Sequence, residues 1–285
     1  MKIDIARQPL VPAFMTLFAL AVAAMCAGIP VSDTSGAVRD ALPLLGGQLA
    51  RFQSAYPVWS KFAAGFMLLF TGMCAGRITI RYNLYTVGTC LPIPLYAIVA
   101  CGIATGGNYL AGFAASMLLA LATKNYCRAF CNGYGFDAIF RASLYLGLMP
   151  LVYAPGLPRL LLRPLAVLLF RRILREVAVA TAGLLLPVFT ACYVSWGTGA
   201  EFTAPLIKLG QSAIEGMPLH LFLDIPLPAL VMAGGIVLLD LTALFFFLAD
   251  IYAAGTKPRF ILFSNIGILI LPLAVLCSPA ATPEA

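Results

Sequence analysis

Apolar runs long enough to cross a lipid bilayer recur along the whole 285-residue chain. The first run, residues 10–29, contains no charged residue. Its length of about 20 residues suits a helix that crosses a hydrocarbon core about 30 Å thick. Hydrophobic residues make up 62% of the sequence and charged residues 10%, so a water-soluble fold would leave much of its surface apolar. The sequence predicts an all-α, polytopic transmembrane bundle, because helices satisfy their own backbone hydrogen bonds in lipid.

Nine apolar segments are expected to span the membrane and to form one integral domain over residues 1–285. They are residues 10–29, 60–76, 84–104, 108–124, 139–155, 158–171, 176–196, 227–250 and 260–277. The fifth and sixth segments are short and contain several prolines, so one broken element or a re-entrant hairpin remains an alternative to two spans.

Lys and Arg residues are divided unevenly between the two sides of this arrangement. If the N-terminus is cytoplasmic, twelve of the 18 Lys and Arg residues, including Arg77 and Arg81, fall on the cytoplasmic side. The positive-inside rule favours that orientation. The net charge of +7 therefore has a topological explanation. Because these residues form no basic face with interleaved aromatics, nucleic acid is excluded as a partner and the bilayer is expected instead.

Two longer stretches between the expected spans, residues 37–57 and 206–222, place apolar residues at helical spacing. Helices of this kind lie along the membrane surface. The alternative is a lid that packs over the helix bundle. The sequence is compatible with both arrangements.

Asp240 is the most unusual polar residue, because it lies near the middle of the eighth expected span. A charged carboxylate at that depth costs on the order of 2.5–3.5 kcal/mol. It should therefore face the protein interior, be protonated or pair with another group. Asp240 is accordingly a candidate for the coupling acid of a transporter, or for a polar contact between two helices.

Basic residues also gather at the cytoplasmic ends of the expected spans. The candidates for contacts with anionic lipid headgroups are Lys124, Arg128, Arg141, Arg171, Arg172 and Arg175. The first three belong to an expected loop with turn-forming residues, and a charged turn that anchors two helices explains them more simply. The last three precede Glu176, which can pair with Arg172 at i, i+4, and they serve as topology determinants.

The sequence shows no set of side chains suited to metal or cofactor binding, or to nucleophilic catalysis. Most of the eight cysteines lie inside apolar runs, where a thiol behaves as a small hydrophobe. Cys127 and Cys131 have i, i+4 spacing, but the only histidine, His220, is far away. No metal site, cofactor or catalytic residue is therefore expected.

Several motifs follow one another in a recognisable order. Leu91-Pro-Ile-Pro-Leu-Tyr96 precedes Gly135-Phe-Asp137-Ala, and Arg175-Glu176 precedes Gly183-Leu-Leu-Leu-Pro187. This order resembles an uncharacterised family of polytopic inner-membrane proteins of the Bacteroidota, over roughly residues 60–200. The resemblance implies the inner membrane of a bacterium. It implies no activity and no site residue, because that family has no assigned function.

Three functional classes agree with these observations. The first is a non-enzymatic component of an envelope assembly, whose interfacial stretches contact other envelope proteins. The second is a transporter or flippase-like permease with Asp240 as its coupling acid. The third is an enzyme that acts on lipid-linked substrates, and it has the fewest supporting residues.

Overall fold

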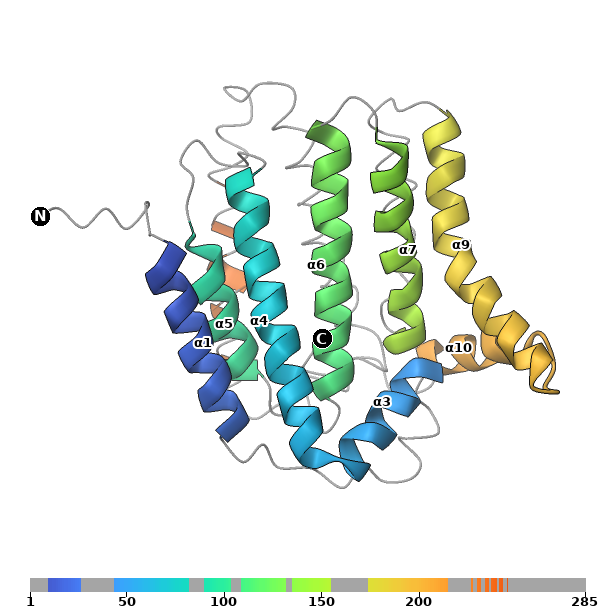
Figure 1. Cartoon of the computed structure of the whole chain (residues 1–285), viewed down its shortest axis with the longest axis horizontal. Helices are drawn as coiled ribbons and strands as arrows, with labels where there is room; N and C mark the ends of the chain where they lie inside the picture. The colour runs from blue at the N-terminus through green and yellow to red at the C-terminus, as the bar shows by residue number, and fades with distance from the viewer. Residues whose placement is uncertain are drawn as a thin grey trace, which may run out of the picture.

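The computed structural model describes residues 10–26, 44–81, 90–103, 109–131, 135–154 and 174–214, and eleven separate positions between 227 and 245. All regular secondary structure in these ranges is helical, which confirms the all-α class. Six helices stand side by side in Figure 1. They are α1 (Leu10–Cys26), α4 (Pro57–Arg81), α5 (Pro92–Ile103), α6 (Tyr109–Cys131), α7 (Phe136–Val152) and α9 (Leu174–Gly197). Two shorter helices, α3 (Leu44–Ala55) and α10 (Ala204–Ile214), lie at one end of these six.

The helices form a group of three joined to a row of three. Helices α1, α4 and α5 pack against one another, α6 packs between α4 and α7, and α7 packs against α9. Helices α4 and α6 run in one direction, and the other four run in the opposite direction (Figure 1). One end of the molecule therefore collects the last turns of α4 and α6 and the first turns of α1, α5, α7 and α9. The opposite end carries α3 and α10.

Six of the nine expected segments coincide with these helices, but several boundaries were wrong. Helix α4 continues to Arg81 instead of ending at residue 76, and α6 continues to Cys131 instead of residue 124. Long cationic side chains continue a helix beyond its apolar part because their aliphatic stems cover apolar surface while the charge reaches water. Helix α5 begins at Pro92 instead of residue 84, at the position where a missing N–H costs nothing.

The remaining expected segments lie wholly or mainly outside the described residues. Residues 158–171 and 260–277 are not among them, and the segment 227–250 is described only at separate helical positions. By length and composition, two described helices, α4 and α9, are long and apolar enough to cross a membrane. The 25 residues of α4 extend about 37 Å at 1.5 Å per residue, more than the hydrocarbon core requires.

The interior contains many alanines beside larger residues such as Leu17, Leu68 and Tyr109, and large apolar side chains also cover much of the outside. The buried alanines include Ala13, Ala21, Ala64, Ala97, Ala122, Ala142 and Ala180. Exposed aromatic side chains include Phe14, Phe18, Phe62, Phe66, Phe189, Tyr193 and Trp196. A water-soluble protein normally buries its large apolar residues, whereas membrane helices pack through small ones. The distribution is the one expected of helices surrounded by lipid.

The closest helix pair, α7 and α9, meets through glycine. A Cβ built on Gly183 would lie 2.8 Å from the Phe140 carbonyl oxygen, and one built on Gly147 would overlap the Leu184 carbonyl oxygen. Both neighbours are backbone atoms, so they cannot rotate away as a side chain would. Glycine at these two positions therefore sets the distance between the two helices.

Buried hydroxyl groups link neighbouring helices. Ser60 Oγ on α4 shares a hydrogen bond of 2.6 Å with the Tyr109 hydroxyl on α6. The Tyr126 hydroxyl on α6 and Ser143 Oγ on α7 are 3.1 Å apart. These bonds connect α4, α6 and α7 in sequence and satisfy polar groups that the interior would otherwise leave without partners.

Helix α3 packs over the end of the bundle. Its residues Leu45 and Leu49 contact the apolar cluster of Ala111, Ala114 and Val152 on α6 and α7. Its buried Gln53 also accepts a hydrogen bond from the Leu110 N–H at 3.3 Å. Both contacts agree with the lid alternative for residues 37–57. Helix α10 includes residues 206–214 of the stretch 206–222, whose other residues lie outside the described ranges, and it contacts α9 and α3.

Candidate functional site

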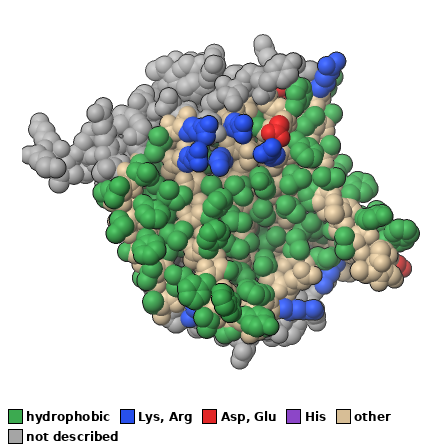
Figure 2. Space-filling model, in the orientation of Figure 1, with side chains coloured by type: hydrophobic (Ala, Val, Ile, Leu, Met, Phe, Trp, Pro, Cys, Tyr) green, Lys and Arg blue, Asp and Glu red, His purple; other side chains and the backbone are tan. Residues whose placement is uncertain are grey.

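Most described positive charges lie at one end of the bundle, which we call the cationic end. Six of the nine Lys and Arg residues in the described ranges belong to it. They are Arg77 and Arg81 on α4, Lys124 and Arg128 on α6, Arg141 on α7 and Arg175 on α9. Figure 2 shows blue side chains gathered above a broad band of apolar ones. The other three, Arg51, Lys61 and Lys208, belong to α3, the start of α4 and α10 at the opposite end.

A cavity of about 540 Å³ lies along the last turns of α4 at the cationic end. Its walls come from α1, α4, α5 and α6, so residues far apart in the sequence meet there. Its volume falls within the range of about 300–1,000 Å³ that is common for small-molecule sites. We call it the α4 cavity.

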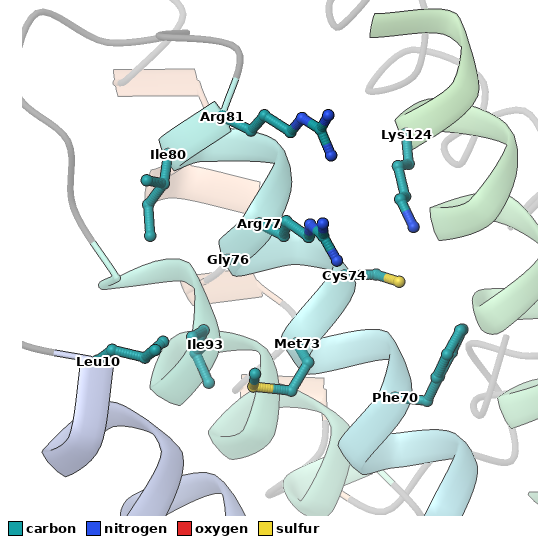
Figure 3. Close-up of a pocket in the computed structure, with 10 residues that line it drawn as sticks. All are labelled: Leu10, Phe70, Met73, Cys74, Gly76, Arg77, Ile80, Arg81, Ile93 and Lys124. Carbon is teal, nitrogen blue, oxygen red and sulfur yellow. The ribbon is translucent and has the colours of Figure 1, made fainter. Parts of the chain in front are cut away.

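Three cations occupy one side of the α4 cavity. Arg77 and Arg81 are four residues apart and therefore share one face of α4. In Figure 3 their guanidinium groups point into the space that the Lys124 side chain enters from α6. Cys74 lines the same cavity as Arg77 and Lys124. Two helices thus direct their positive charges towards one small volume.

Apolar side chains form the other side of the α4 cavity. Leu10 of α1 and Ile93 of α5 lie on the opposite side of α4 from Lys124 (Figure 3). Gly76 lets α5 approach α4 here, because a Cβ on Gly76 would overlap the Ile93 side chain. The cavity therefore combines a cationic side with an apolar side, which suits a molecule that has an anionic group and a hydrocarbon part.

No carboxylate balances these three cations within the part of the chain that the structure describes. None of the ten described lining residues is acidic. The ion pair at this end joins Arg141 Nε to Asp137 Oδ1 at 2.9 Å, on an exposed face of α7 away from the cavity lining. Like charges held close together repel one another, and an anion between them removes that repulsion.

The structure separates the basic residues that the sequence placed together. Lys124 lines the α4 cavity, whereas Arg128, Arg141 and Arg175 are exposed outside it. Lys124, Arg128 and Arg141 were also expected in a loop, and this was wrong because α6 continues to Cys131 and α7 begins at Phe136. The other candidates, Asp240, Arg171 and Arg172, lie outside the described residues.

Two features of this end were not expected from the sequence. Arg77 and Arg81 were considered only as orientation signals, although their i, i+4 spacing beyond Gly76 could have indicated one helical face. Glu176 was expected to be able to pair with Arg172, which lies outside the described residues, and its burial in the first turn of α9, at 5% exposure, was not expected. A carboxylate at that position interacts favourably with the positive end of the helix dipole.

Metal-ligating side chains do not converge in the described ranges. No group of three His, Cys, Asp or Glu residues with the geometry of a metal site occurs there. Cys127 is buried on α6 and behaves as a core residue.

No protein-family model, curated protein or solved structure matches this chain. The resemblance to inner-membrane proteins of the Bacteroidota therefore stays a prediction. The geometry of the chain itself is the basis for a functional proposal.

Proposed function

We propose that this chain is a multi-pass integral protein of a bacterial inner membrane, with its cationic end on the cytoplasmic side. The observation that carries the proposal is the set of large apolar side chains on the outside of the bundle, bounded by unequal charge at its two ends. In water such a surface would promote aggregation, whereas in a bilayer it contacts lipid. The excess of cations at one end favours the cytoplasmic side for that end.

The direction of the helices supports the expected nine spans. Helices α7 and α9 run the same way, so α7 ends at the opposite end of the bundle from the start of α9. A separate sixth span at residues 158–171, which lie outside the described residues, agrees with this direction better than a hairpin does, because it places the start of α9 on the same side as the start of α1.

Reporter fusions test this orientation. We expect a reporter that is active only outside the cytoplasm to be active after residues 56 and 200, and inactive after residue 134. The physical reason is that α3 and the end of α9 lie opposite the cationic end, where α6 ends and α7 begins. A cytoplasmic reporter at the same three positions serves as the control and should give the reverse pattern. If all three positions fall on one side, the multi-pass proposal is wrong.

Within that membrane, we propose the role of a non-enzymatic component of an envelope assembly. Support comes from the end opposite the cations, where α10 and the turn before it expose Phe202, Leu206 and Ile207. Helix α10 already packs through Leu209, so these apolar groups form a second face. Large exposed apolar groups beyond the membrane-facing surface suit contact with another protein.

Affinity purification in mild detergent tests the assembly role. We expect the wild-type chain to retain a stoichiometric envelope protein that a variant with Leu206→Glu and Ile207→Glu loses, because charge on the contact face opposes burial. Lys208→Glu, at an exposed position on the same helix, is the matched control and should retain it. If the wild-type chain purifies alone, the assembly role is wrong.

The α4 cavity favours a flippase-like permease as the second candidate. A permease for anionic amphiphiles needs a place where charge and hydrocarbon are both accommodated, and this cavity offers both. The role of Asp240 as its coupling acid stays a prediction. The enzyme that acts on lipid-linked substrates also stays a prediction.

A further inference from the structure

We infer that the α4 cavity is a binding site for an anionic phospholipid of the cytoplasmic leaflet. The lipid phosphate would lie among Arg77, Arg81 and Lys124, and an acyl chain would follow the apolar side formed with Leu10 and Ile93. The inference rests on the proposed membrane placement. It adds a ligand class and three residues that the placement alone does not supply.

The charged groups suit a phosphate. Guanidinium groups bind phosphate oxygens through paired N–H donors, and an ammonium group adds a compact charge. Arg77 and Arg81 come from one helix and Lys124 from another, so a phosphate between them would also join α4 to α6. An anion at this point relieves the repulsion among three cations that no described carboxylate balances.

The apolar side identifies the phosphate as that of a lipid. Leu10 and Ile80 line the cavity, and both side chains are exposed. An inorganic phosphate would leave these side chains uncovered, whereas an acyl chain on the same molecule would cover them, and at the level of the headgroups this removes apolar area from water. The site also lies in the final turns of α4, at the depth where Lys and Arg of a membrane helix meet headgroups.

Native mass spectrometry of the full chain in detergent tests the assignment, with phosphatidylglycerol and phosphatidylcholine of identical acyl chains as probes. We expect selective binding of phosphatidylglycerol. A variant with Arg77→Gln, Arg81→Gln and Lys124→Gln should bind it on the order of 100-fold more weakly, from about 1 kcal/mol for each lost charge. The matched variant with Arg128→Gln, Arg141→Gln and Arg175→Gln removes the same charge outside the cavity and should bind like wild type.

A second variant examines the apolar side and does not depend on the three cations. Leu10→Gln with Ile80→Gln changes exposed side chains, and we expect weaker binding of phosphatidylglycerol with unchanged binding of inorganic phosphate. If this variant binds phosphatidylglycerol like wild type and inorganic phosphate displaces the lipid, the site is a phosphate site and the lipid assignment is wrong. Equal losses in the two triple variants would also overturn it, because general surface charge would then explain the binding.

Alkaline extraction of native membranes separates this inference from the proposed function. If the chain is released, the membrane placement fails and the lipid site fails with it. If the chain stays in the membrane but shows no preference between the two phospholipids, only the lipid site is wrong.

Discussion

Replacing Gly147 with valine is expected to destabilise the bundle by about 3 kcal/mol or more. A Cβ at this position would overlap the Leu184 carbonyl oxygen on α9, so the two helices would have to separate. Separation would also disturb the adjacent contact of Gly183 with Phe140. The measurement is thermal unfolding in detergent with a thiol-reactive dye, which reports the exposure of buried cysteines such as Cys127 and Cys192.

Gly210→Val on α10 is the matched control for this prediction. Apart from α10's own neighbouring backbone, no atom of the described chain lies within 4 Å of a Cβ built on Gly210. Its effect should stay within about 0.5 kcal/mol, as for other surface substitutions. We expect the Gly147→Val midpoint to fall by roughly 10 °C relative to this control. Equal midpoints in the two variants would show that α7 and α9 do not pack in this way.

Replacing Phe66 with arginine should sharply reduce insertion of the chain into membranes. Phe66 lies near the middle of α4 with its side chain 66% exposed, so the new charge would face the surroundings of the bundle. In hydrocarbon this costs about 2.5–3.5 kcal/mol, whereas at a water-facing position it costs less than about 0.5 kcal/mol. The measurement is the amount of chain that remains in membranes after an alkaline wash.

Trp59→Arg provides a control with similar exposure at a different depth. Trp59 is 68% exposed and lies seven residues nearer the start of α4. An arginine there can extend to the headgroups, so insertion should fall much less than with Phe66→Arg. If the alkaline wash releases the wild-type chain and both variants alike into the soluble fraction, water surrounds α4 and the membrane placement is wrong.

The sequence was informative about helices because its signal is local. The run of apolar residues between Glu176 and Gly197 predicts α9 almost to its ends, since both length and hydropathy are properties of adjacent residues. The ends of α4 and α6 were less accurate. A Lys or Arg residue ends an apolar run in the sequence, but the helix can continue past it. The sequence near Arg77 and Lys124 contains no signal that distinguishes a helical turn from a loop.

The candidate site was only partly predictable. Lys124 was among the expected headgroup contacts, but its partners Arg77 and Arg81 were not, because they come from a helix that precedes it by more than 40 residues. Glu176 is a similar case. Its charge and position before an apolar run suggest a surface residue, and its burial depends on which face α9 turns towards its neighbours.

Helical class, a preference for lipid over water and the side that carries the positive charge follow from residue order alone, since each is a sum over neighbouring side chains. The α4 cavity and the closeness of α7 to α9 do not. They depend on which helix faces meet, and that choice is made by contacts between distant residues, such as Gly76 with Ile93 and Gly147 with Leu184. Close packing depends on how well the side chains of facing helices fit together, and those surfaces meet only when the helices are assembled.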